Sequence, residues 1–395
     1  MEIKLLKRKD IPTAKKLWGY AFEKNEPFYS WYFEEVFQPE NTLGVFVDEH
    51  LISSLQLNPY QLFLHENPFS CSYVVGVVTA PEYRNRGFMK PLLKKALEEM
   101  AARNHHLSIL MPFDTHYYVP YGWELCYSLL RYETPIQNLK KLSKPSGFFS
   151  RIDPRKDLAS LDSIYQQYLR GYHGHVLRSE RDWQHLLQDL LHDGGHGFLL
   201  RDENQEPIGY MLYYMEDYGL HGKELAYTSP AAQKSIFDFL YRHKSQIERI
   251  SWDAPFGDVT HLYLQDTITP KPLNSVKVLP FMAGRIVNVK GAFEHSHFSP
   301  LLSGKICLEV EDSSAPWNHN RFLFDIQKGK IEVREEPAGP VDVHCKINTL
   351  SQLFWGVIDI EQAEALELVR IAPFADRELL SGLFQRKKTY IHEYF

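Results

Sequence analysis

The segment from residue 69 to residue 100 constrains the fold of this chain more than any other part of the sequence. It begins with a nearly unbroken apolar run at residues 73–78, whose β-branched content is typical of a central strand buried on both faces. After an arginine-rich turn, apolar residues recur at positions 89, 92, 93, 96, 97 and 100, which is the spacing of one helix face. The sequence therefore predicts a buried strand, a basic turn and an amphipathic helix in direct succession.

The turn at residues 83–87 has the composition of an anion site. Unpaired N–H groups at a helix start, together with the positive end of the helix dipole, attract negative charge. Gly87 carries no Cβ and lets the backbone approach a diphosphate closely, while Arg84 and Arg86 add positive charge. A solvated basic turn is the alternative for such a short motif alone, but the position between strand and helix favours phosphate binding.

The overall charge and the cysteines limit the class of protein. With 44 Lys and Arg against 50 Asp and Glu, the net charge of −6 argues against nucleic acid and mildly favours a cationic small substrate. The 4 cysteines are widely spaced, which excludes a disulfide framework or a structural zinc site of the usual kind. The charged N-terminus is no signal peptide, and no apolar stretch could span a membrane, so we expect a cytoplasmic protein.

The chain divides into three parts by pattern. At 395 residues it exceeds what one core usually serves, and residues 140–147 shift toward linker composition. A second α/β stretch repeats the order strand, loop, helix, strand over 224–252, without an arginine- and glycine-rich turn. From about residue 286, strands precede helices in an α+β pattern. We therefore predict α/β domains over 1–140 and 141–285 and an α+β domain over 286–395.

The residues from Val77 to Gly87 resemble the acetyl-CoA motif of the GNAT superfamily, Arg/Gln-x-x-Gly-x-Gly/Ala. Arg84 and Gly87 match this pattern, whereas Met89 departs from its last small position. With its length and three-part layout, the chain resembles the Eis (enhanced intracellular survival) family of N-acetyltransferases. This resemblance implies two GNAT-like domains, the second degenerate, followed by a sterol-carrier-protein-like α+β domain. It covers essentially the whole chain, but only the motif of the first domain is specific.

The resemblance also implies a site for acetyl-CoA, as co-substrate, on the first domain. In the family, the backbone of the motif strand holds the pantetheine arm, the turn and first helical residues hold the diphosphate, and the next strand end lies nearby. The implied residues are Val77, Val78, Thr79, Arg84, Asn85, Arg86, Gly87, Phe88, Met89, Lys90, Phe113 and Asp114.

Two catalytic residues follow from the same resemblance. Amine acetylation needs an acid for the departing thiolate and a base for the amine proton. The stretch from Tyr118 to Gly122 resembles the family's Tyr-x-x-Phe/Tyr-Gly, which implies Tyr118 as general acid; a packing aromatic is the alternative. In the family, the carboxylate at the end of the chain accepts the amine proton, and the corresponding group here is the carboxylate of Phe395. A free carboxylate is a weak base unless burial or bridging water assists it. The alternative is that Phe395 only fills a gap in the core.

We therefore predict an acetyl-CoA-dependent N-acetyltransferase that acts on a primary amine, aminoglycoside-, polyamine- or lysine-like, by direct attack in a ternary complex. A non-catalytic acyl-CoA or lipid-binding protein is the first alternative, and transfer of a longer acyl group is the second. The resemblance further implies a homo-oligomer, either a hexamer or a smaller assembly. Neither nucleic acid nor a membrane is an expected partner.

Two other features have weaker interpretations. Histidine pairs occur at 105–106, 173–175 and 192–196, but none supplies three or four ligands at a recognised spacing, so no metal site is predicted. The aromatic-rich segment 28–37 contains Glu34 and Glu35, either of which could attract a cationic amine at the substrate mouth. An amphipathic helix that buries its aromatics explains this segment equally well.

Overall fold

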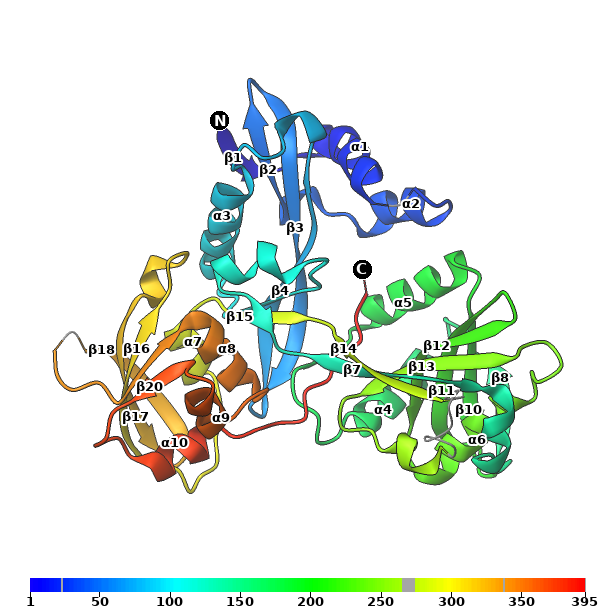
Figure 1. Cartoon of the computed structure of the whole chain (residues 1–395). Helices are drawn as coiled ribbons and strands as arrows, with labels where there is room; N and C mark the ends of the chain where they lie inside the picture. The colour runs from blue at the N-terminus through cyan, green and yellow to red at the C-terminus, as the bar shows by residue number, and fades with distance from the viewer. Residues whose placement is uncertain (23, 265–273, 337, 395) are drawn as a thin grey trace.

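The computed structural model describes residues 1–22, 24–264, 274–336 and 338–394. Within these residues the strands form three sheets, and each sheet with its helices makes one lobe of the molecule (Figure 1). The first lobe contains the N-terminus. The second and third lobes lie on either side of its long central strands (Figure 1).

The sheet of the first lobe has the order β1-β2-β3-β4-β5-β15-β6, with β9 paired to β3. Its β4 and β5 are parallel neighbours, whereas β3 and β4 form a long antiparallel hairpin. One face packs against α1 and α2, and the other against α3, whose predicted apolar stripe is buried. The elements are β1 Glu2–Leu5, α1 Ile11–Ala21, α2 Phe28–Trp31, the π-helical turn η2 Tyr32–Val36, β2 Thr42–Val47, β3 His50–Leu64, β4 Asn67–Thr79, α3 Met89–Ala102, β5 Leu107–Leu110, β6 Glu124–Leu125, β9 His175–Val176 and β15 Ala283–Ile286.

The sheet of the second lobe repeats this plan, in the order β14-β7-β13-β12-β11-β10-β8. Its β12 and β13 are the parallel pair. Alternate residues of β11 pack toward α4 and α5 on one face and toward α6 on the other. The elements are β7 Ser128–Pro135, β8 Phe148–Arg151, α4 Leu158–Tyr168, α5 Glu180–His192, β10 His196–Arg201, β11 Pro207–Glu216, β12 Gly219–Tyr227, α6 Pro230–Tyr241, β13 Arg249–Pro255 and β14 Ser275–Pro280.

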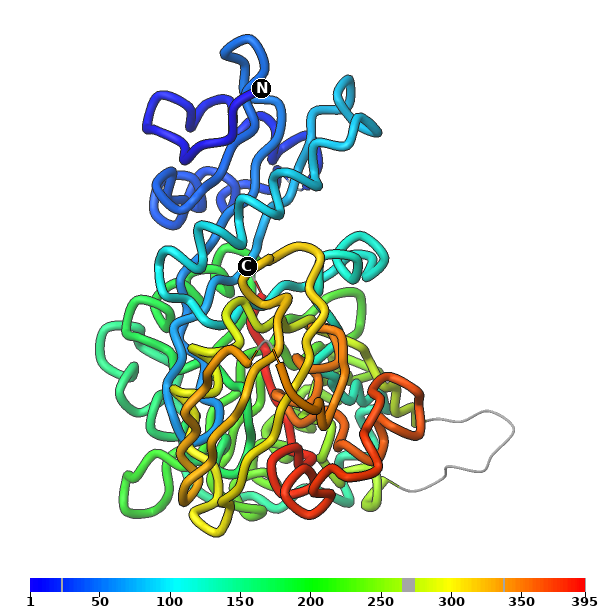
Figure 2. The backbone as a smooth tube through the Cα atoms, turned by 90° about the vertical axis from the view of Figure 1, so that its left-hand side faces the viewer, coloured from blue at the N-terminus to red at the C-terminus, as the bar shows by residue number. Residues whose placement is uncertain are grey.

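The third lobe combines the sheet β18-β17-β16-β19-β20 with four helices. After its last helix, the chain returns between the lobes and reaches the level of the first lobe in both views (Figures 1 and 2). The elements are α7 Val289–Glu294, β16 Gly304–Glu311, β17 Asn320–Gln327, β18 Lys330–Glu335, β19 Val343–Lys346, α8 Ile347–Trp355, α9 Ile360–Ala365, β20 Val369–Ile371 and α10 Arg377–Leu383.

The lobes exchange strands across the sequence. β7 precedes residue 140 but lies in the second sheet, and β15, which ends at residue 286, lies in the first. The predicted linker near residue 140 begins as a 3-10 helix, Ile136–Lys141, whose Ile136 and Leu139 are buried against the second sheet. The residue-level boundaries of the three domains therefore stay predictions, because the elements of the first and second lobes interleave along the sequence, whereas those of the third lobe run without interruption from α7 to α10.

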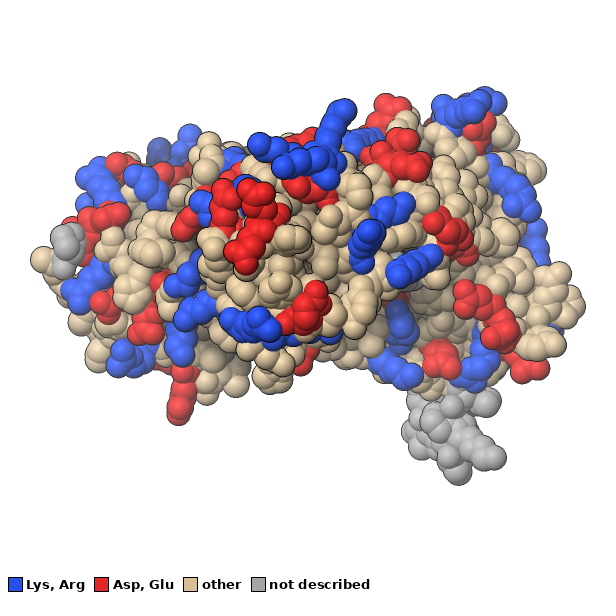
Figure 3. Space-filling model, turned by 90° about the horizontal axis from the view of Figure 1, so that it is seen from above, with Lys and Arg blue, Asp and Glu red and all other residues tan. Residues whose placement is uncertain are grey.

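The surface carries charges of both signs. On the face seen in Figure 3, Lys and Arg alternate with Asp and Glu rather than forming one continuous basic band. Among the helices of the described residues, none is long and apolar enough to cross a bilayer.

Candidate functional site

The central parallel strands of the first lobe separate at their C-terminal ends. β4 and β5 pair from Cys71 with Leu107 to Val74 with Leu110, and β4 then continues to Thr79 without a β5 partner among the described residues. Its pairing with β3 shifts register in the same stretch. There Gly76 adopts a φ of +61°, and an added Cβ would lie 2.5 Å from the ring of Trp18. The main chain beyond Val74 therefore borders an open gap.

The turn that follows β4 leaves its amides unpaired. The N–H of Arg84 donates to the carbonyl of Pro81 at 3.3 Å, but within the described chain no N–H of residues 85–90 donates to a protein acceptor. Gly87 has a φ of +80°, and its Cβ position has no neighbour within 4 Å. Phe88, the N-cap of α3, supplies no side-chain cap. Unpaired donors thus gather at the positive end of a helix, in open space.

The two arginines of the turn contact nearby residues of the first lobe. Arg84 donates from Nε to the carbonyl of Thr79 at 3.1 Å and lies 5.5 Å from the ring centre of Tyr20. Arg86 lies 5.3 Å from the ring centre of Tyr83. Arg84 thereby ties the end of β4 to the start of the turn.

The neighbouring strand residues are held from β3. The hydroxyl of Ser53 donates to the carbonyl of Val78 at 2.7 Å and lies 2.9 Å from the Thr79 hydroxyl. Val77, between the bulge and Val78, is half-buried. The predicted pantetheine-binding residues therefore lie on a fixed strand at the edge of the gap.

The segment after β5 brings the predicted acid to the same end of the sheet. Phe113 is 78% exposed, and Asp114 accepts from the main-chain N–H and the ring of His116, bonds that lower the pKa of its carboxyl. Tyr118 packs with residues of α3 and the end of β5, and burial raises its pKa to about 12. Its hydroxyl has no hydrogen-bond partner among the residues that the structure describes. The phenol therefore remains protonated at neutral pH and is free to donate.

The turn that carries Tyr118 is braced by a buried ion pair that sequence reasoning missed. Arg285, on β15, donates to the carbonyl of Tyr121 and lies 2.7 Å from the carboxylate of Asp312 in the third lobe. Gly122 has a φ of +93°, and a Cβ there would lie 1.5 Å from the Arg285 guanidinium. Asn348 of α8 donates to the carbonyl of Val119 at 3.0 Å. In the sequence, a single arginine inside the apolar stretch 281–287 could have indicated a buried charge of this kind.

A cavity of about 620 Å³ opens on the α1 side of the gap. Met111, directly after β5, and Trp18, which packs against Gly76, both line it, so the cavity reaches the separated strands. Its far wall comes from the second lobe, and a smaller hollow adjoins it with Phe28, Asp189 and Tyr394 in common. Glu34 and Glu35 are exposed and do not belong to the lining of either space as described. The carboxylates at this cavity belong to α5 and β11 instead.

Phe395, the predicted base, lies outside the described residues. The residues before it are described: Ile391 and Glu393 are buried, and Tyr394 lines the cavity.

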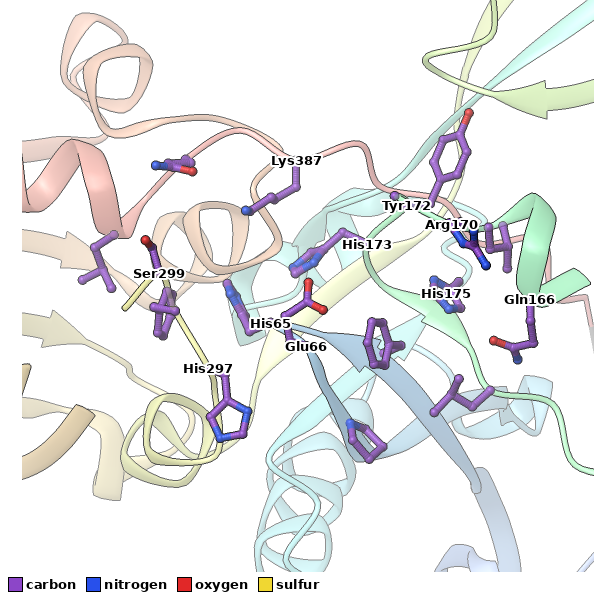
Figure 4. Close-up of a pocket in the computed structure, with 18 of the residues that line it drawn as sticks. His65, Glu66, Gln166, Arg170, Tyr172, His173, His175, His297, Ser299 and Lys387 are labelled. Carbon is purple, nitrogen blue, oxygen red and sulfur yellow. The ribbon is translucent and has the colours of Figure 1, made fainter. Parts of the chain in front are cut away.

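A second cavity, of about 860 Å³, lies at the other end of β4, where the three lobes meet (Figure 4). β4 begins at Asn67 and the gap opens at Val75, so this cavity and the start of the gap lie roughly 25 Å apart along the strand. Burial lowers the pKa of His65 to about 3 and that of His175 to about 4, so both rings are neutral. No group of three or more potential metal ligands occurs anywhere in the described residues, including these histidines.

Comparison with known proteins gives each lobe a family. Residues 2–126 and 174–286 each match a model described as an acetyltransferase (GNAT) domain, and residues 289–392 match a sterol carrier protein domain. The search of curated proteins finds no match. The predicted fold class, two GNAT domains followed by a sterol-carrier-protein domain, is confirmed.

Solved structures share the complete architecture. A probable N-acyltransferase of unknown function from Enterococcus faecalis matches with a TM-score of 0.87 and 23% identity, over 100% of this chain and 99% of that one. A GCN5-related N-acetyltransferase from Anabaena variabilis matches at 0.85 and 20%, over 100% of both chains. Eis1 from Mycobacterium abscessus matches at 0.78 and 19%, also over 100% of both. At such identities these likenesses establish the fold alone.

Proposed function

We propose that this chain, an acetyltransferase of Eis-like architecture, transfers an acetyl group from acetyl-CoA to a primary amine by direct attack in a ternary complex. The observation that carries the proposal is the set of unpaired amides at residues 85–90, beside strands that have separated. A buried or self-capped turn would have no donors left for a diphosphate.

The turn and the strand edge fit the two ends of the cofactor. Amides of Asn85, Arg86, Gly87, Phe88, Met89 and Lys90 would hold the diphosphate, because the space above Gly87 is empty. The main chain of Val77, Val78 and Thr79 would hold the pantetheine arm along the gap. Arg84 would fix the turn through Thr79, and Phe113 and Asp114 would flank the cofactor from the end of β5.

The reaction needs one proton removed and one supplied. The amine nitrogen would attack the thioester carbonyl, so that a C–N bond forms and the C–S bond breaks. Tyr118 would protonate the departing sulfur; its place in the turn that follows β5, beside the start of the gap, supports this role. The carboxylate of Phe395 would accept the proton from the amine. Tyr394, the preceding residue, lines the cavity that reaches the gap, which supports this assignment.

The cavity favours a cationic acceptor, such as an aminoglycoside, a polyamine or a lysine side chain. Its two cationic side chains are already paired, Lys223 with Asp189 at 2.7 Å and Arg131 with Asp253 at 2.7 Å. Further carboxylates line it or the adjoining hollow, and aromatic faces can attract an ammonium group. These residues are Asp182, Asp193, Glu216, Trp18, Phe28 and Trp31.

Calorimetry with acetyl-CoA, followed by thiol release with a panel of polyamines, aminoglycosides and lysine peptides, tests the proposal. We expect saturable binding and turnover with at least one amine class. Absence of acetyl-CoA binding would refute it, and tighter binding of longer acyl-CoAs in competition would favour a longer acyl group.

A change at the end of the chain distinguishes the proposed enzyme from a non-catalytic acyl-CoA or lipid-binding protein. Adding one residue after Phe395 displaces the carboxylate, so the enzyme should lose turnover while its fold and acetyl-CoA binding persist. A binding protein would be indifferent to this addition.

Assembly and location are further parts of the proposal that come from the family resemblance. We expect a cytoplasmic homo-oligomer, a hexamer or a smaller assembly. Light scattering of the purified chain measures the assembly directly.

A further inference from the structure

The second lobe contains a buried cluster of charged side chains on its α4 and α5 face. Three strands, a loop and the last described residues of the chain contribute to it. Burying unpaired charges is costly, so a cluster of this kind must be matched internally. Its members are Arg131, Arg178, Glu224, Asp253, His392 and Glu393.

Arg178 is the centre of the cluster. Its guanidinium donates to both carboxylate oxygens of Glu224, at 2.8 and 2.7 Å, and from Nε to Glu393 at 2.9 Å. The same guanidinium lies 4.2 Å from the ring centre of Tyr165 and 4.6 Å from that of Trp183. Each of the three guanidinium nitrogens of this buried arginine thus donates to a carboxylate, either of Glu224 on β12 or of Glu393.

His392 lies between the two strand carboxylates. Its Nδ1 is 3.9 Å from Glu224, and its Nε2 is 3.6 Å from Asp253, which Arg131 binds with two bonds of 2.7 Å. With His392 protonated, three cations would face three carboxylates. Burial lowers the pKa of His392, but the two carboxylates outweigh it and the net shift is upward.

The cluster covers a gap between strands. β12 and β13 pair from Gly219 with Arg249 to Gly222 with Trp252; beyond this last pair, Asp253 is the next residue of β13 and Glu224 the second residue of β12. Glu224 accepts from the hydroxyl of Tyr210, which packs toward α4 and α5. This face corresponds to the α1 face of the first lobe, where the acceptor cavity lies.

The tail segment, residues 389–394, is fixed along this face. The N–H of Tyr390 donates to the carbonyl of His173 at 3.1 Å, and the N–H of His173 donates to the carbonyl of Lys388 at 2.8 Å. Ile391 is 0% exposed. Tyr394 packs 5.2 Å from the ring of Phe281 and lines the acceptor cavity. Figures 1 and 2 both place the end of the chain at the level where the first lobe meets the others.

We propose that this cluster is a clamp, in which Arg178, Glu224 and Asp253 are positioning residues that hold the tail segment and so fix one wall of the acceptor cavity. Only a single arrangement of the tail pairs His392 and Glu393 together, because a shift of one residue would bring Ile391 or Tyr394 to one of the two positions. The clamp gives the degenerate GNAT domain a role in the reaction at the other domain. The expected effect of the clamp on turnover rests on the proposed function, whereas its expected effect on the protection of the tail segment does not.

Hydrogen–deuterium exchange of the full chain tests the clamp without any substrate. Arg178→Lys cannot make the forked contact, and Glu393→Gln removes one charge at nearly constant volume. In each variant we expect the amide hydrogens of residues 390–393 to exchange at least roughly tenfold faster than in wild type. The exchange rates of the β4 amides should not change. Arg377→Met, which breaks an exposed pair with Glu364 in the third lobe, is the matched control and should leave the tail protected. Unchanged tail exchange in Glu393→Gln would overturn the clamp.

Steady-state kinetics separate positioning from folding. For both clamp variants we expect kcat to fall by about 100-fold, with a higher KM for the amine and an unchanged Kd for acetyl-CoA, because the first lobe is intact. Faster tail exchange with wild-type kcat and KM would overturn the positioning role. If wild type itself turns over no amine, the proposed function fails, and the exchange experiment still decides the clamp.

Discussion

In both GNAT domains of this chain, the two central parallel strands separate after four residue pairs. The residues that border the gap beyond these pairs differ between the two domains. In the first, four residue pairs join β4 to β5 before the gap opens, and in the second four pairs join β12 to β13. Beyond them, the first domain has a glycine bulge and an open cavity. The second has Glu224 and Asp253, paired with residues of its own chain.

The helix starts differ in the same way. Residues 85–90 before and within α3 keep their amides unpaired over the described chain, and Gly87 leaves open space. At α6, the hydroxyl of Ser229 accepts from the N–H of Ala232 at 3.2 Å, and Pro230 has no N–H to offer. One fold therefore provides an open or a closed helix start, depending on whether its own side chains satisfy the first amides.

The largest expected difference between the two domains concerns tyrosines in the short helical turns that follow β5 and β13. Tyr118→Phe removes the proposed acid, so kcat should fall by about 100-fold to 1,000-fold while acetyl-CoA binds as before. Tyr263→Phe, in the turn Thr260–Tyr263 of the second domain, should change neither quantity. Stopped-flow and steady-state thiol release measure both variants. An unchanged kcat in Tyr118→Phe would leave Tyr118 as a packing aromatic.

A smaller effect is expected at the helix starts. Gly87→Val places a β-branched residue at a φ of +80° and fills the space beside the amides, so acetyl-CoA should bind about 100-fold more weakly. Ser229→Ala removes the cap of α6 and should cost about 1 kcal/mol of stability without changing acetyl-CoA binding. Calorimetry measures the affinity for acetyl-CoA, and thermal unfolding measures the change in stability. Equal affinities of the Gly87→Val variant and wild type would contradict the diphosphate site.

The smallest effect is a pH dependence confined to the second gap. The raised pKa of His392 stabilises the clamp fully below its ordinary value of 6.5, and this contribution disappears as the pH rises through the folded value. The pKa values of Glu224 and Asp253 are lowered, because Arg178 and Arg131 outweigh the effect of burial, so their contribution is lost only in acid. His221 on β12 also interacts with His392, and this interaction lowers the pKa of His221. Because amide exchange is itself base-catalysed, the comparison uses the protection factor of the tail, which is the intrinsic exchange rate divided by the observed rate. This protection factor should fall above pH 6.5 in wild type and should stay constant over the same pH range in His392→Gln. A wild-type protection factor that does not change with pH would contradict the prediction.

Sequence reasoning found what local pattern determines. Leu92, Leu93, Ala96, Leu97 and Met100 have helical spacing, and all are buried. The turn at Gly87 was recognisable because its conformation depends on consecutive residues. The roles of Tyr118 and Phe395 came from the family resemblance and stay predictions.

Long-range pairings were out of reach. Arg285 contacts Tyr121 164 residues away, and Arg178 contacts Glu393 215 residues away, so no periodicity reports either contact. An amphipathic helix was one of two interpretations of the segment 28–37. The segment divides into α2 and a π-helical turn, because tertiary packing of its aromatics overrides the local spacing.

The number of acetyl-CoA molecules that one chain binds tests the central claim most directly. Calorimetry of the purified protein, with the active fraction known, gives this stoichiometry. A single site per chain, abolished or strongly weakened by Gly87→Val and unaffected by Ser229→Ala, is the predicted result. Two sites per chain, or one site that survives Gly87→Val, would contradict the account, because the second gap would then be accepting the cofactor.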